Sequence, residues 1–149
     1  MTARFNAFKV APLLTKALMG VEAALADSGL EHGLMELVRL RASQINGCSF
    51  CIQLHVADAK AHGEAELRMI MLDAWRDSPL FSDRERAALA WTEGLTDIAR
   101  THAPDADYEL ARSQFSEAEI VSLTILVGQI NSWNRLQIAA RATHPLKAA

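Results

Sequence analysis

The sequence predicts an all-α fold. Apolar residues recur at helical spacing in every stretch long enough to test, and no stretch alternates apolar and polar residues with the β-branched enrichment of strands. Of the 149 residues, 50% are hydrophobic and 22% are charged, which is typical of a globular chain and excludes a disordered or collagen-like one. This length suits one domain, so we expect residues 1–149 to fold as a single compact, multi-helix unit.

The first three predicted helices cover residues 12–26, 31–45 and 48–62. Pro12 suits the first turn of a helix, where its missing N–H would have no partner. Gly47 separates the second helix from the third, and glycine commonly ends a helix in the left-handed conformation. On the second helix the side chains expected on one side are Leu34, Leu37, Val38, Arg41 and Ile45.

The remaining predicted helices follow start signals in the second half of the chain. A fourth helix is expected over residues 64–75, and residues 104–112 read as a short helix or turn. Two serine–glutamate capping boxes open the longer helices, Ser82 with Glu85 and Ser116 with Glu119. The inner stripe of the helix after Ser82 is expected to hold Ala87, Trp91, Gly94, Leu95 and Ile98.

The helix after Ser116 is apolar on nearly every side over residues 120–130. Such a helix is central in its domain or is buried between subunits. A chain this short would have difficulty covering it alone, so we expect a homo-oligomer.

Charge and hydropathy exclude several classes of partner. The chain has 15 Lys and Arg against 18 Asp and Glu, a net charge of −3, so we expect no nucleic-acid partner. The most apolar run, residues 120–130, is shorter than the ~20 residues that span a bilayer, so we expect no membrane partner. Without a signal-like leader the protein is expected to be cytoplasmic. In a reducing cytosol a close cysteine pair is a redox or metal candidate before a structural one.

The sharpest motif is the pair Cys48 and Cys51 with His55 four residues after the second cysteine. On a helix these three side chains share a face. At a helix start the backbone N–H groups and the helix dipole stabilise a thiolate, which makes the pair a redox candidate. Half of a zinc site is the alternative, but zinc needs about four ligands and only His55 and Glu36 could join the two thiolates.

Other polar and aromatic residues have ordinary readings. Glu36 lies in an apolar stretch and either points inward or belongs to a solvated helix face. Arginines at positions 39 and 41 suit a surface or an ion pair. We expect helix-capping or solvent-exposed positions for four histidines, His32, His62, His102 and His144. We expect the three tryptophans, Trp75, Trp91 and Trp133, to lie in the core or at an interface. We expect no cofactor.

Three runs together resemble a known family. They are residues 36–51 with His55, residues 85–91 and residues 131–135. This pattern closely resembles the alkylhydroperoxidase AhpD-like branch of the carboxymuconolactone decarboxylase superfamily. Its specific part is a glutamate twelve residues before a C-x-x-C, with a histidine four residues after the second cysteine. One difference is Phe50, which stands where AhpD carries a second histidine.

The resemblance implies a compact AhpD-like fold, a trimer or hexamer, and a thiol peroxidase that uses no cofactor or metal. It assigns Cys51 as the peroxidatic cysteine, Cys48 as the resolving cysteine, and His55 and Glu36 as a proton relay. The implied partners are a hydroperoxide substrate and a dithiol or protein reductant. The alternatives are a lactone decarboxylase like the superfamily's namesake, which needs no cysteine pair, and a non-enzymatic oligomer that responds to the redox state.

Overall fold

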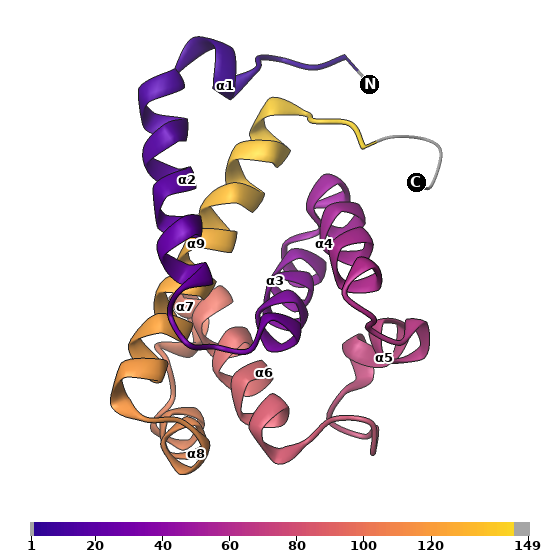
Figure 1. The fold of residues 1–149 in the computed structure, drawn as a ribbon, viewed down its shortest axis with the longest axis vertical. Helices are drawn as coiled ribbons and strands as arrows, with labels where there is room; N and C mark the ends of the chain where they lie inside the picture. Colours follow the sequence, from indigo (N-terminus) through magenta and orange to yellow (C-terminus); the bar gives the residue numbers. More distant parts are fainter. Residues whose placement is uncertain (1, 145–149) are drawn as a thin grey trace.

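Every regular element in the described part of the chain, residues 2–144, is a helix in the computed structural model (Figure 1). The all-α prediction is therefore confirmed. The α-helices, with one short 3-10 helix η1, are α1 (Ala7–Val10), α2 (Pro12–Ala26), α3 (His32–Asn46), α4 (Ser49–Ala61), α5 (Glu66–Met71), η1 (Leu72–Ala74), α6 (Asp83–Thr96), α7 (Ile98–Thr101), α8 (Asp105–Gln114) and α9 (Glu117–Ala140).

The start and stop signals of the sequence act as expected. Ser82 and Ser116 each accept a hydrogen bond from the backbone three residues on, and the glutamates at those positions complete both capping boxes. Gly47 ends α3 at a φ of 67°, in the left-handed region that glycine adopts without strain. The helix expected over residues 64–75 is shorter, because α5 tightens into the 3-10 turn η1 at Leu72.

Two residues that the sequence predicts to face the core are exposed in the structure. Ile98 does not belong to the stripe of α6, because α6 ends at Thr96 and the chain turns into α7, which leaves Ile98 51% exposed. Ile45 is 39% exposed, since it lies on the last turn of α3, beyond the packed middle of that helix. The other predicted positions on these two helices are buried or half-buried.

Helix α3 lies at the centre of the fold. Its Leu34 and Val38 join a core cluster with α6, α8 and α9, while Leu37 and Leu40 join a second cluster with α4, α5 and α6. The sequence predicts that the helix after Ser116 is either central in its domain or buried between subunits. In the structure α9 packs one face on the core and leaves Val121 and Ile125 about half exposed, and burial between subunits stays a prediction.

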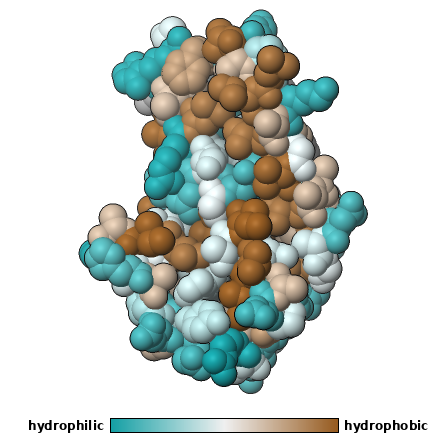
Figure 2. Space-filling view, turned by 90° about the vertical axis from the view of Figure 1, so that its left-hand side faces the viewer, coloured by the Kyte–Doolittle hydropathy of each residue, from teal (hydrophilic) through white to brown (hydrophobic). Residues whose placement is uncertain are grey.

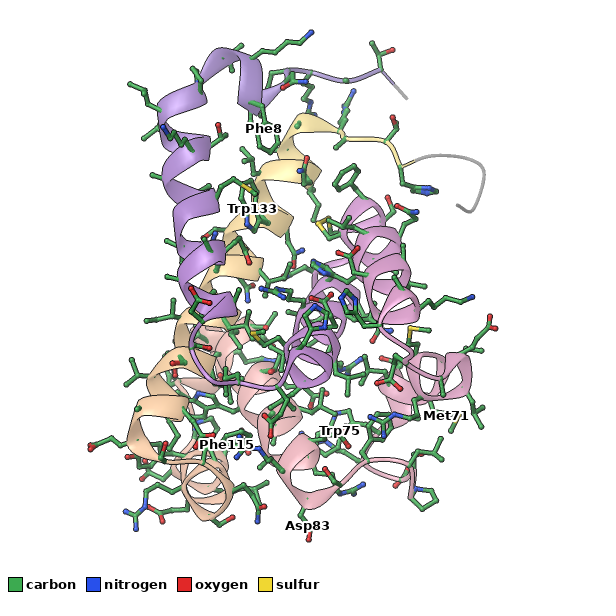
Figure 3. The ribbon with its side chains drawn as sticks, in the orientation of Figure 1. Phe8, Met71, Trp75, Asp83, Phe115 and Trp133 are labelled. Atoms are coloured by element: carbon green, nitrogen blue, oxygen red, sulfur yellow. A yellow bond between two sulfur atoms is a disulfide. The ribbon has the colours of Figure 1, made fainter. Side chains whose placement is uncertain are left out.

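Helices α1 and α2 form an N-terminal arm that lies along α9 (Figure 1). On the arm, Phe8 stacks on Trp133 of α9 with ring centroids 6.0 Å apart, a contact labelled in Figure 3. The outer side of the arm is strongly apolar, and Figure 2 shows hydrophobic surface across this side of the molecule. Within residues 2–144, no helix combines the length and the hydropathy that a membrane crossing requires.

A buried polar contact holds the turn before Cys48 against α9. The Asn46 side-chain amide donates to the Oδ1 atoms of Asn131, at 3.0 Å, and Asn134, at 2.8 Å. The Asn134 amide in turn donates to Ser43 Oγ at 3.0 Å, and Asn134 is fully buried. These bonds fix the end of α3, and with it the start of α4, relative to α9.

Candidate redox site

The two cysteines stand at the first turn of α4, where the sequence places them. Cys48 is the N-cap residue, and its Sγ accepts a hydrogen bond from the Cys51 backbone N–H at 3.3 Å. The two sulfurs form a disulfide, and the two residues are 1% and 2% exposed. Because Cys51 belongs to the helix and Cys48 precedes it, the pair lies at the positive end of the α4 dipole.

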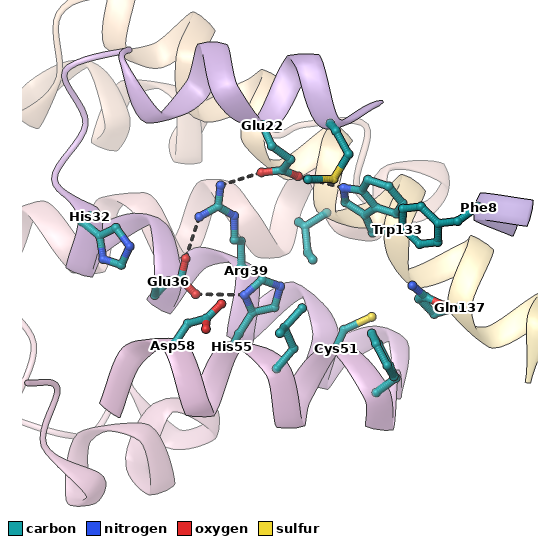
Figure 4. Close-up of a pocket in the computed structure, with 14 residues that line it drawn as sticks. Phe8, Glu22, His32, Glu36, Arg39, Cys51, His55, Asp58, Trp133 and Gln137 are labelled. Atoms are coloured by element: carbon teal, nitrogen blue, oxygen red, sulfur yellow. Dashed lines mark hydrogen bonds and ion pairs between the residues drawn. The ribbon is translucent and has the colours of Figure 1, made fainter. Parts of the chain in front are cut away.

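His55 and Glu36 meet beside Cys51, further along α4, as Figure 4 shows. His55 follows Cys51 by one helical turn, and its Nδ1 lies 2.9 Å from Oε2 of Glu36 on α3. The inward alternative for Glu36 is therefore the correct one, with a residue exposure of 3%. Burial alone raises the pKa of the Glu36 carboxyl, but the hydrogen bond from His55 and the Arg39 guanidinium hold this pKa below its usual value. An ionised Glu36 fixes the Nδ1–H tautomer of His55 and leaves Nε2 able to accept a proton.

The polar chain continues beyond Glu36 to the N-terminal arm. Arg39 Nη1 lies 2.6 Å from Glu36 Oε1, and Arg39 Nη2 lies 2.7 Å from Oε2 of Glu22 on α2. The other oxygen of Glu22 accepts a hydrogen bond from the Trp133 indole at 2.8 Å. One connected set of side chains therefore joins α9, α2, α3 and α4 (Figure 4).

A pocket of about 470 Å³ opens in front of these groups. Cys51 is among its lining residues and Cys48 is not. Most of the wall is apolar, formed by Phe8, Met19, Phe50, Leu54, Ile130 and Trp133. A small organic molecule with an apolar body therefore has a surface to contact beside the Cys51 sulfur.

Three groups in the pocket carry ligand atoms that a metal ion could use. One ligand atom each of Glu36, His55 and Asp58 lies within 4.8 Å of the others. Both oxygens of Glu36 already bind Arg39 and His55, and a structural zinc site takes four ligands. This arrangement does not favour a metal, and the expectation of a metal-free site stays a prediction.

The four central residues of this site were predictable from the sequence, whereas the residues around them were not. Glu22 and Asp58 gave no signal, because charged residues on helices are usually solvated. Arg39 was expected at the surface or in an ion pair, and the structure pairs it with both Glu36 and Glu22. His32 and His62 are exposed as expected, but their rings also stack with centroids 3.9 Å apart, and His32 lines the pocket. Trp133 is half-buried and lines the pocket.

Comparison with known proteins defines the family. The model of the carboxymuconolactone decarboxylase family matches residues 12–94, which is more than half of the chain and includes Glu36, both cysteines and His55. The chain belongs to the carboxymuconolactone decarboxylase family. Its similarity to the uncharacterised protein YdfG of Bacillus subtilis is 38% identity over 139 residues, covering 93% of this chain and 95% of YdfG.

Solved structures place the chain among AhpD-like members of this family. The structure of ATU0492 from Agrobacterium tumefaciens, a protein of unknown function proposed to be an antioxidant defence protein AhpD, matches with a TM-score of 0.95 and 42% identity. The match covers 98% of this chain and all of that one. The debrominase Bmp8 shares the fold at a TM-score of 0.82 and 17% identity, over 91% of this chain and 73% of that one. A peroxidase-related protein from Silicibacter sp. shares it at 0.79 and 24% identity, over 89% and 71%.

Proposed function

We propose that the protein is a thiol-dependent peroxidase that reduces hydroperoxides through the Cys48 and Cys51 pair. The observation that carries this proposal is the placement of Cys51 in the pocket wall, one helical turn from a histidine held by a buried glutamate. Peroxide attack needs a thiolate, and a histidine base oriented by a carboxylate supplies one at neutral pH.

In the first step the Cys51 thiolate attacks the outer oxygen of the hydroperoxide. The O–O bond breaks, Cys51 becomes a sulfenic acid, and the alkoxide takes the proton that His55 removed from the thiol, so that an alcohol leaves. In the second step the Cys48 sulfur attacks Cys51 Sγ and expels water. The resulting disulfide is the state of the pair in the structure. A dithiol reductant, small or carried by a protein, returns both cysteines to thiols.

The pocket favours organic hydroperoxides over hydrogen peroxide as substrates. Its apolar side chains have no group to recognise in hydrogen peroxide, whereas an alkyl or aryl hydroperoxide buries its body against them. Phe50 adds to this apolar wall at the position where AhpD carries a histidine.

We further propose that the whole chain acts as one domain in a homo-oligomer, a trimer or hexamer, in the cytosol. Support comes from the apolar outer side of the arm, where Val10, Leu13 and Leu14 are between 71% and 81% exposed. Apolar surface of this kind is typical of an interface between protein chains.

The decisive experiment is steady-state reduction of a hydroperoxide with a dithiol reductant. Turnover that is lost in Cys51→Ser supports the peroxidase. A lactone decarboxylase would act on its lactone and leave the peroxide unchanged. A non-enzymatic redox-responsive oligomer would change its mass with the disulfide state and show no turnover of either compound.

A further inference from the structure

Arg39 divides its two terminal nitrogens between two carboxylates. Nη1 binds Oε1 of Glu36, and Nη2 binds Oε2 of Glu22. A guanidinium and a carboxylate prefer to pair through two parallel hydrogen bonds, using both oxygens of the acid. At Glu36 the second oxygen is instead left for His55 Nδ1. Arg39 therefore makes a single hydrogen bond with Glu36, whereas a guanidinium and a carboxylate can form two.

We propose that Glu22 is a positioning residue for the relay. By holding Arg39 Nη2, Glu22 prevents Arg39 from taking both oxygens of Glu36, and so keeps Oε2 for His55. The inference rests on the proposed function in one respect, the role of His55 as the base for Cys51.

One further contact and partial burial hold the Glu22 carboxylate in place. Its second oxygen accepts the Trp133 indole N–H at 2.8 Å, so the carboxylate is fixed from both sides. The side chains of Arg39 and Glu22 are 11% and 23% exposed, which limits competition from water and screening by salt. An exposed ion pair would lack both properties.

Other charged groups around His55 do not replace Glu22. The titratable and charged groups that line the pocket are Glu22 from α2, His32, Glu36 and Arg39 from α3, and Cys51 and Asp58 from α4. Helices α1 and α9 contribute Phe8, Ile130, Trp133 and Gln137, which carry no charge. Of the carboxylates in this set, Glu22 and Glu36 are the two paired with Arg39.

The test uses Glu22→Gln in a Cys48→Ser background, with two readouts. The first is the rate at which iodoacetamide alkylates Cys51, measured against pH. The second is the NMR signal of the His55 Nδ1–H, which a bond to a carboxylate shifts downfield. Glutamine keeps an oxygen for Trp133 but loses the charge that holds Arg39. We expect alkylation to be about three- to tenfold slower near neutral pH and unchanged at alkaline pH, and the downfield signal to be lost.

Two rescue variants separate positioning from a merely structural role. In Arg39→Gln, and in the double variant with Glu22→Gln, no guanidinium competes for Glu36, so the downfield His55 signal is expected to be retained. Alkylation rates of these two variants are not used, because Arg39 itself contacts Glu36 and lines the pocket. The matched control is Glu31→Gln, which breaks the two-point pair of Glu31 with Arg84, at 2.9 and 3.1 Å, outside this pocket. The control is expected to change neither readout.

The inference is overturned if Glu22→Gln behaves like Glu31→Gln, or if the double variant lacks the downfield His55 signal as Glu22→Gln alone does. Thermal unfolding of each variant identifies any that does not fold. If the double variant does not fold, Arg39→Gln by itself tests the inference, because loss of the His55 signal in Arg39→Gln would also contradict it. Both readouts work without a peroxide substrate. A protein that gives the expected pattern but reduces no hydroperoxide would refute the proposed function and leave this role of Glu22 standing.

Discussion

His55 Nδ1 and Glu36 Oε2 lie 2.9 Å apart, although 19 residues separate them in the chain. The two side chains come from α4 and α3, which pack along each other with Gly47 at the turn between them. This pairing fixes the imidazole at the pocket wall, and in the proposed mechanism it makes Glu36 the second member of the relay.

Loss of either relay residue should slow the first chemical step in a pH-dependent way. We expect Glu36→Gln and His55→Ala to reduce the rate of Cys51 oxidation by about 10²-fold near neutral pH, because the thiol then lacks its base. Part of this loss should be recovered at alkaline pH, where the thiol ionises unaided. Stopped-flow kinetics of Cys51 oxidation by a hydroperoxide, recorded at several pH values, measures this rate.

His62→Ala is the control for the histidine, since His62 caps the other end of α4 and is exposed. A His55→Ala protein as fast as this control at pH 7 would exclude His55 as the base.

The two cysteines should give different products when each is replaced. Cys48→Ser is expected to form one sulfenic acid on Cys51 and then stop, because the resolving sulfur is gone. Cys51→Ser is expected not to react with peroxide, since Cys48 does not line the pocket. Trapping with dimedone followed by peptide mass spectrometry checks both variants. A sulfenic acid on Cys48 in the Cys51→Ser protein would reverse the assignment.

The arm should determine preference among hydroperoxides. Phe8 lines the pocket without belonging to the relay, so Phe8→Ala is expected to lower kcat/KM for cumene hydroperoxide about three- to tenfold. The kcat/KM for hydrogen peroxide should change less than twofold, because hydrogen peroxide buries little apolar surface. Phe5→Ala removes an exposed phenylalanine that does not line the pocket and serves as the control. Equal losses for both peroxides would argue against a specificity role.

The outer side of the arm should be required for assembly. Leu13→Glu and Leu14→Glu place a charge on residues that are 81% and 71% exposed, and we expect the oligomer to dissociate to the 16.3 kDa chain. Light scattering at micromolar concentration measures the mass. Leu67→Glu, on α5 and 58% exposed, should leave the mass unchanged. A parent protein that is itself monomeric would contradict the predicted oligomer directly.

Acid should destabilise the fold through carboxylates whose pKa values are lowered. The Ser116 backbone N–H and the Arg84 guanidinium lower the pKa of Glu119 to about 2. Because the folded pKa lies below the unfolded one, this stabilisation is fully present above about pH 4.5 and is lost as the pH falls towards 2.

Glu119→Gln should therefore lower the free energy of unfolding by about 1 kcal/mol at pH 6 and by less at pH 3. Urea denaturation at the two pH values measures this difference. Glu109→Gln is the control, since Glu109 is exposed and its contact with Arg112 is 3.6 Å long. A loss for Glu119→Gln that is equal at both pH values would contradict the assignment.

Local signals made most of the fold predictable from the sequence. Capping boxes, Gly47 and helical apolar spacing depend on residues close in the chain, and the helices they predict are present. The pair Cys48 and Cys51 with His55 was predictable for the same reason, since one helix carries all three. The exposure of Ile98 could not be predicted, because no glycine or proline signals the end of α6 at Thr96.

The parts of the site that depend on tertiary packing could not be predicted in this way. Nothing local indicates that Glu22 on α2 meets Arg39 on α3, or that Trp133 on α9 reaches the same carboxylate. The central place of α3 also follows from packing, since α3 and α9 are both rich in apolar residues. For Glu36, spacing alone left two orientations open, and packing against α4 decides between them.

The pocket gives access to one sulfur only, and this restricts the order of events in a catalytic cycle. In the proposed cycle, hydroperoxide and reductant would both have to reach Cys51, because Cys48 lies outside the pocket wall and is 1% exposed. The two reagents therefore cannot be bound productively at once, and the alcohol must leave before the reductant enters. If the protein is the proposed peroxidase, it is therefore expected to follow a ping-pong mechanism, in which each reagent at high concentration competes with the other for the same entrance.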